Sequence, residues 1–197
     1  MVGESVRTMP VQEIGEIVAA AVDGDHEAVG RLLAYLRPLV VRYCRARFSG
    51  QERSSGSADD VAQEVCFAVL KSLPSYRDEG RPFLAFVYGI AQHKVADAHR
   101  ASARNRSEPV AALPESAAPG EAGPEQSVLR AELTEQLSRL LEKLPEKQRE
   151  IVLLRVVLGL SSEETAEAVG STPGAVRVAQ HRALARLRKV LAAEEVI

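Results

Sequence analysis

The chain has 197 residues, which is enough for one domain of ordinary size or for two small ones. Hydrophobic residues make up 46% of it and charged residues 26%, which excludes a generally disordered chain, and no apolar run approaches the roughly 20 residues that a membrane-spanning helix needs. The net charge of -2 excludes a uniformly basic nucleic-acid-binding surface, so any contact with DNA must be local. Acidic residues stand near the start, where a signal peptide has its apolar core, and this predicts a cytoplasmic protein without membrane insertion.

The sequence offers no catalytic constellation. Its two cysteines, Cys44 and Cys66, both lie within apolar helical patterns and are too few for a disulfide framework or a four-ligand zinc site. The four histidines are scattered, and no glycine-rich phosphate loop or nucleophile motif is present. We therefore expect a protein that is not an enzyme and that holds no metal and no cofactor.

The first part of the chain predicts a bundle of helices. Residues 1–24 carry a weak helical pattern and are expected to pack on that bundle as an N-terminal extension. Asp25 can cap a first amphipathic helix, a second begins near Ser57 and stops at Pro74, and Pro82 opens a third that turns basic in its later half. No segment alternates with a period of two, so the fold class predicted is all-α.

A proline-rich connector divides the chain into two small helical domains. Residues 104–127 hold four prolines and no aromatic residue, which is typical of a flexible linker. This length is unusual for a loop inside one domain, and its extended reach is on the order of 80 Å. The boundaries predicted are therefore 1–24, 25–103, 104–127 and 128–197.

The second domain ends in a pattern that predicts a helix-turn-helix. Ser161 and Glu164 form a capping box for a short helix, and Thr172 begins the last helix. Between them, Ala166 and Gly170 have the spacing of a crowded helix contact and a left-handed turn. The last helix is basic, which favours DNA binding, although packing alone also produces this geometry and a basic last helix also complements its own dipole.

Several motifs in a fixed order resemble those of the extracytoplasmic-function, or group 4, sigma factors of the sigma-70 family of RNA polymerase subunits. They are DDVAQE at 59–64, FLAFVYGIA at 83–91, the proline-rich connector, and LPEKQRE at 144–150 ahead of the helix-turn-helix. The similarity extends over about residues 25–191 and points to the actinobacterial sigma-D/ShbA-like branch. It implies a non-catalytic initiation subunit whose first domain (region 2) binds core RNA polymerase and opens the -10 element, and whose second (region 4) recognises the -35 element.

The resemblance also implies roles for individual residues. The acidic helix would dock on the clamp coiled-coil of the largest polymerase subunit, and region 4 on the flap; the docking residues on the helix are Asp59, Asp60, Gln63 and Glu64. For the two aspartates alone, a favourable interaction with the helix dipole is an equally good explanation. An unstacked base of the -10 element would enter a site with aromatic walls and a basic backbone-binding edge, comprising Tyr76, Arg77, Asp78, Phe83, His93, Lys94 and Arg100.

Two positions depart from the family pattern. Phe86, which an ordinary core role also explains, replaces the usual tryptophan, and Gln92 with His93 replaces a common arginine-asparagine pair, so the -10 preference of other members does not transfer. The -35 element would be contacted by Thr172, Arg177, His181, Arg182 and Arg186. An anti-sigma factor is a further partner that the family implies. Two other functions fit the residues less well, namely an ordinary two-domain transcriptional regulator and a helical adaptor without a DNA role.

Overall fold

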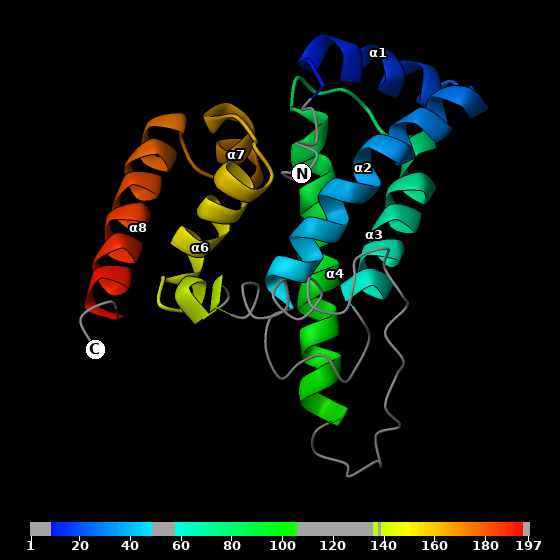
Figure 1. Ribbon diagram of the computed structural model, residues 1–197. Coiled ribbons are helices and arrows are strands. Elements are labelled where there is room, and N and C mark those ends of the chain that lie inside the picture. Colours follow the sequence, from blue (N-terminus) through cyan, green and yellow to red (C-terminus); the bar gives the residue numbers. More distant parts are fainter. Residues whose placement is uncertain (1–8, 49–57, 106–135, 138, 195–197) are drawn as a thin grey trace, which may run out of the picture.

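A computed structural model describes residues 9–48, 58–105, 136–137 and 139–194, and the part of the chain that it describes is helical without a strand. Figure 1 shows one group of helices made by the N-terminal half and a second group, made by the C-terminal half, standing beside it. The order of elements is α1 (Val11–Val22), α2 (His26–Arg47), α3 (Ala58–Ser72), the 3-10 turn η2 (Leu73–Ser75), α4 (Phe83–Asn105), α6 (Glu146–Val152), the π-helical turn η3 (Leu153–Val157), α7 (Ser162–Ala168) and α8 (Pro173–Glu194). The all-α prediction is confirmed.

Helices α1 to α4 form a four-helix bundle. Asp25 caps α2 as predicted, because its carboxylate accepts hydrogen bonds from the backbone amides of Glu27 and Ala28 at 2.8 and 3.3 Å. The apolar faces of α2, α3 and α4 then meet in one core, with Tyr43, Val65 and Val87 fully buried at its centre. The proposed cap of α3 at Ser57 lies outside the described residues.

The N-terminal extension is an integral part of this core. Helix α1 buries the four residues whose spacing predicted a helix, which are Ile14, Ile17, Val18 and Ala21. They belong to the same hydrophobic cluster as the faces of α2 and α4. The expectation that this segment packs on the bundle is confirmed for Val11–Val22.

The C-terminal group contains the predicted helix-turn-helix. Ser161 and Glu164 form the full capping box of α7, with the Ser161 amide donating to Glu164 at 2.7 Å and the Glu164 amide donating to Ser161 at 3.0 Å. Gly170 adopts a φ of 59°, the left-handed conformation that the turn needs. Ala166 and Val176 are buried together in one small cluster, so the contact between the two helices is the tight one that the spacing predicted.

The two groups are in contact with each other. Leu154, Leu158 and Leu160 of the C-terminal group belong to the same hydrophobic cluster as the N-terminal bundle. The Tyr43 hydroxyl donates to Glu150 at 2.7 Å, and Arg47 pairs with the same carboxylate at 3.1 Å. Helix α4 continues to Asn105, and the rest of the linker, from residue 106, lies outside the described residues. Two groups that the sequence predicts to be separate domains therefore bury surface against one another.

Candidate nucleic-acid interface

A groove between α2 and α3 holds three of the four residues predicted to dock on the polymerase. Asp59, Asp60 and Gln63 line it, together with apolar side chains of both helices. Glu64, the fourth, lies outside this lining and pairs instead with Lys94 of α4 at 3.2 Å. The predicted set therefore divides between two surfaces.

Asp59 is engaged within the bundle. Its carboxylate accepts two parallel hydrogen bonds from the guanidinium of Arg45, both at 2.9 Å. This bidentate pair raises the pKa of Arg45 further above its usual range. Because both side chains are more than half exposed, the pair contributes little to folding stability. It connects the first turn of α3 to α2.

Phe67 is a residue of this groove that the sequence reasoning missed. It lies one turn after Gln63, lines the same groove, and is 69% exposed, which is the largest exposure among the exposed large hydrophobic residues of the described part of the chain. The signal was present in the sequence, because Phe67 falls outside the apolar stripe of α3 formed by Val61, Val65 and Val69. The ring of Phe67 adds exposed aromatic area to the groove beside Gln63.

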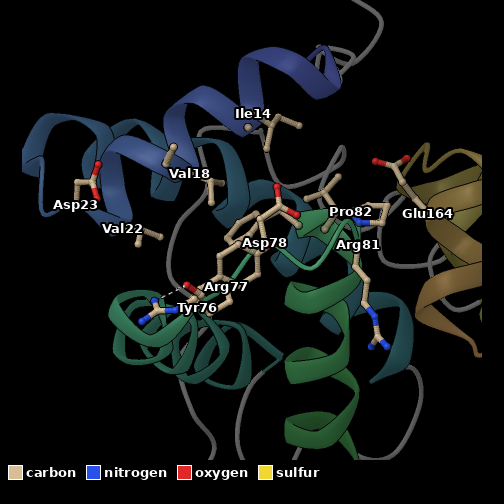
Figure 2. A pocket seen from close by; sticks show the side chains of 14 residues that line it. Ile14, Val18, Val22, Asp23, Tyr76, Arg77, Asp78, Arg81, Pro82 and Glu164 are labelled. Carbon is tan, nitrogen blue, oxygen red and sulfur yellow. Dashed lines mark hydrogen bonds between the residues drawn. The ribbon is translucent and has the colours of Figure 1, made fainter.

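A second site lies where the loop before α4 meets α1. Tyr76, Arg77, Asp78 and Phe83 line a pocket of about 380 Å³, a volume in the range of small-ligand sites. Figure 2 shows Tyr76 and Asp78 facing this space from the loop, and Ile14, Val18 and Val22 of α1 forming the opposite wall. The structure thus brings together four of the seven residues predicted to bind the -10 element, and it adds a wall from α1.

The walls of this pocket are held by aromatic and turn contacts. The rings of Tyr76 and Phe83 meet edge to face at a centroid distance of 5.2 Å, and Phe86 lies 5.0 Å from Tyr76. Asp78 accepts a hydrogen bond from the amide of Gly80 at 2.8 Å, and Gly80 has a φ of 77°, so the loop contains an Asx turn that needs glycine. Burial raises the pKa of the Tyr76 hydroxyl, which therefore stays neutral at physiological pH. Phe86 is partly buried against the main core.

The other three predicted -10 residues lie further along α4 and do not line the pocket. His93 is exposed, Lys94 pairs with Glu64, and Arg100 pairs with Asp97 of its own helix. Arg100 follows Phe83 by 17 positions, which is about 25 Å along a helix. These residues therefore form an edge that extends from the pocket and not a part of it.

Helix α8 presents its basic side chains to solvent. Thr172 caps it, with its hydroxyl oxygen accepting from the amide of Ala175 at 3.2 Å. The basic side chains of the helix are all exposed: Arg177, His181, Arg182, Arg186, Arg188 and Lys189. Val178, which is half exposed, adds an apolar side chain next to Arg177. Four of the five residues predicted for the -35 element therefore lie on α8, and the fifth, Thr172, caps it.

Arg177 is held by the helix that precedes it. Its guanidinium donates to the Ser162 hydroxyl at 3.2 Å and lies 3.6 Å from the Glu163 carboxylate, both at the start of α7. The side chain remains exposed, so it can exchange this carboxylate for a phosphate or a base edge without leaving a buried charge. Residues four apart share one helix face, so Arg177 and His181 point in similar directions.

Matches to two family models and to several relatives identify the chain. The model of sigma-70 region 2 matches residues 32–105, and that of sigma-70 region 4 matches residues 134–187. The ECF RNA polymerase sigma factor SigD of Mycobacterium tuberculosis (strain ATCC 25618 / H37Rv) is 60% identical, over 94% of this chain and 87% of its own length. The chain belongs to the extracytoplasmic-function sigma factors. The ECF sigma factor ShbA of Streptomyces griseus is 49% identical over 89% of this chain and 93% of its own length.

Solved structures agree with the fold. CnrH in complex with the cytosolic domain of CnrY matches with a TM-score of 0.66, at 24% identity, over 90% of this chain and 96% of that one. The sigma factor RpoE of Bartonella quintana, in complex with the anti-sigma factor NepR, matches with a TM-score of 0.57 at 20% identity over 83% and 96%. The resemblance predicted from the motifs is confirmed, and with it the function of this ECF sigma factor, which is to direct promoter-specific initiation of transcription.

The remaining observations concern catalysis and membranes. Within the residues that the structure describes, no cluster of three metal-ligating side chains occurs. No helix in that part of the chain is both long enough and apolar enough to cross a bilayer. Burial raises the pKa of the Cys44 thiol to about 12, so this cysteine is a protonated core residue at physiological pH.

Proposed function

We propose that this sigma factor divides its work among three surfaces: the groove between α2 and α3 docks on core RNA polymerase, the pocket between α1 and the loop before α4 captures a base of the -10 element, and α8 contacts the -35 element. The observation that carries this assignment is the pairing of an aromatic pocket with an exposed basic recognition helix in one chain. A single-stranded base and a duplex groove call for those two different kinds of surface. The domain boundaries at residues 25–103 and 128–197 belong to the same proposal.

The polymerase-binding surface combines charge with one aromatic anchor. Asp60 and Gln63 offer acceptor and amide groups to a basic helix of the clamp coiled-coil, and the exposed ring of Phe67 supplies apolar area beside them. Asp59 acts mainly through Arg45, as a positioning residue, because its carboxylate is already paired. The flap of the polymerase would bind region 4.

The -10 pocket fits a flat, partly apolar ligand with polar edges. Tyr76 and Phe83 give aromatic walls, Asp78 gives a hydrogen-bond acceptor, and Arg77 gives a donor at the rim. Val18 and Val22 close the far side, so α1 contributes to the shape that the extruded base meets. Lys94 and Arg100 continue the basic edge along α4 toward the phosphate backbone.

The chain acts as a non-catalytic subunit in the cytoplasm, where it requires core polymerase and promoter DNA as partners. Core polymerase supplies the catalysis. An anti-sigma factor is a further proposed partner, supported by the fold shared with RpoE, whose solved complex contains the anti-sigma factor NepR.

A run-off transcription assay tests this proposal. Purified core polymerase is mixed with the full-length chain and a library of promoter fragments, and transcripts are mapped to their start points. New initiation that depends on both the -35 and the -10 sequence is the expected result. Initiation that is unchanged when the pocket is filled by Val22→Trp, a partly buried residue of its wall, would contradict the assignment of the -10 site, and Leu191→Ala, on exposed surface at the far end of α8, is the control.

A further inference from the structure

Helix α8 carries an apolar side chain at the centre of its exposed face. The opposite face packs on α6 and α7 through the buried Val176 and Ala183, and Figure 1 shows α8 at the outer edge of the molecule with those two helices on its inner side. At about 100° per residue, Val178 lies within about 30° of the direction opposite to this buried pair. Its exposed fraction of 50% agrees with that position.

Basic side chains flank Val178 on both sides. By the same helical count, Arg177 and Arg182 lie about 70° to either side of the centre of the exposed face. Arg177 points toward α7, where its guanidinium is 3.6 Å from the Glu163 carboxylate, and Arg182 is exposed. The sequence of α8 holds no acidic residue before Glu194. One apolar side chain between cations fits a polyanion better than an apolar protein surface.

The first turn of α8 carries little side-chain bulk. Gly174 and Ala175 are both exposed, and a Cβ atom added at Gly174 would meet no atom of the described chain beyond its own turn within 4 Å, so packing does not require glycine there. The backbone at the start of the helix can therefore come close to a partner. Val178 is the sixth residue of α8, about 8 Å from its start, and the major groove of DNA is about 12 Å wide. This places Val178 among the N-terminal residues with which a recognition helix contacts base edges.

The fold gives no reason for a valine at this position. A branched side chain loses rotamer freedom in a helix, and an exposed position offers little packing to offset that loss. Valine also has no hydrogen-bonding group, so it cannot recognise a base through the donors and acceptors that the groove displays. The base feature of the major groove that favours an apolar contact is the C5-methyl group of thymine.

We propose that Val178 is a specificity-determining residue of the -35 contact and that it packs against the methyl group of a thymine in the major groove. The inference rests on the proposed function, because it requires α8 to contact the -35 element. It gives Val178 a role that differs from that of the flanking arginines, which offer hydrogen bonds and charge. Burial of one methyl group should favour thymine over an unmethylated pyrimidine by about fourfold in affinity.

Replacing thymine by deoxyuridine tests the contact, because it removes the methyl group and keeps the base pair. The -35 element is first selected from the promoter library by the full-length chain with core polymerase. Each thymine of that element, on either strand, is then replaced singly, and binding to core polymerase with the full-length chain is measured by competition against the selected promoter. For the parent, one replacement should lower the affinity by about fourfold.

The Val178→Ala chain should lose this discrimination. It should bind the selected promoter about fourfold more weakly than the parent and should be indifferent to the same replacement. Alanine is the better helix former and the valine is half exposed, so circular dichroism should show unchanged helical content. Leu191→Ala, which shortens an exposed apolar side chain at the far end of α8, is the matched control and should keep the sensitivity to deoxyuridine.

Methylated cytosine gives the reciprocal measurement. Where the sensitive thymine is exchanged for cytosine, 5-methylcytosine should restore part of the affinity for the parent and none for Val178→Ala. The inference would be overturned by a selected -35 element without an A·T pair, by the absence of any sensitive thymine, or by a Val178→Ala chain that still distinguishes thymine from deoxyuridine. Binding that depends on the -35 sequence but not on a methyl group would refute this inference alone, whereas binding that does not depend on the -35 sequence at all would refute the proposed function.

Discussion

Replacing Phe67 by alanine should weaken core polymerase binding more than any other single change in the groove between α2 and α3. The ring is 69% exposed in the free chain, and a buried aromatic side chain covers about 150 to 250 Å². The area still available is therefore about 100 to 170 Å², worth at most about 2.5 to 4 kcal/mol at 25 cal/mol per Å². Since a partner covers only part of it and alanine keeps some contact, we expect a loss of about 2 kcal/mol, or about 30-fold in Kd.

The measurement is a competition for core polymerase between labelled parent and unlabelled variant, both full length. Phe67→Leu should keep most of the affinity, because it preserves apolar bulk in the groove. Leu191→Ala removes an exposed apolar side chain from α8 and serves as the control for a general loss of hydrophobic surface. The thermal stability of Phe67→Ala should stay within a few degrees of the parent, because the ring buries little in the folded chain.

Equal competition by Phe67→Ala and the parent would refute this reasoning. It would mean that the groove does not face the polymerase, and that the exposed ring serves another partner. A large fall in affinity together with a large fall in thermal stability would also refute it, because the ring would then be part of the fold.

Three further predictions follow from the geometry. The double change Asp60→Ala with Gln63→Ala should weaken core binding by roughly 1 to 3 kcal/mol without loss of helical content, and a double variant that competes as well as the parent would be contrary evidence. Arg177→Ala should alter base preference at the -35 element by about 1 to 3 kcal/mol, whereas Arg186→Ala, nine positions further along α8, should lower affinity uniformly and reduce its salt dependence; binding to a library of -35 variants distinguishes the two. Burial raises the pKa of all four tyrosines, with Glu150 raising that of Tyr43 further, so tyrosinate absorbance at about 295 nm should appear only above pH 10. Because the folded state binds the tyrosine protons more tightly than the unfolded state, the free energy of unfolding should be unaffected by them below pH 10 and should fall as the pH rises beyond it. A normal rise of tyrosinate absorbance at pH 10 in the folded chain would contradict the burial.

Local signals in the sequence were sufficient for most of the fold. The Asp25 cap, the capping box at Ser161 and the left-handed Gly170 each depend on residues within a few positions, and each appears in the structure. The helix-turn-helix was predictable for the same reason, because Ala166 and Val176 meet across one short turn. The π-helical turn at Leu153–Val157 was not predicted, since the same apolar run fits an α-helix. In the structure the Leu158 amide donates to the Leu153 carbonyl, five residues back, at 3.1 Å.

The sequence predicted which residue types form the site, but it did not predict which side chains pair with one another. The sequence predicted Asp59 to be a docking carboxylate, yet Arg45 on the neighbouring helix donates two hydrogen bonds to it. Glu64 and Lys94 were assigned to different partners, and they pair with each other across α3 and α4 at 3.2 Å. A side chain's partner depends on which helices become neighbours, and helical periodicity gives the buried face of each helix without giving its neighbours.

The contact between the two helical groups was also not predictable, and here the interacting residues are more than 100 positions apart in the sequence. Glu150 lies in the segment LPEKQRE, where the sequence suggests an exposed, charged first turn. Its partners Tyr43 and Arg47 are 107 and 103 positions earlier, beyond a linker that predicts independent domains. Leu154, Leu158 and Leu160 likewise suit the core of region 4 alone, yet they join the N-terminal cluster. The contact therefore combines a buried, paired carboxylate with buried leucines, and both kinds of contact depend on helices that only the tertiary structure brings together. Helical periodicity gives the buried face of each helix, and a charged residue such as Glu150 is buried only because Tyr43 and Arg47 are there to pair with it.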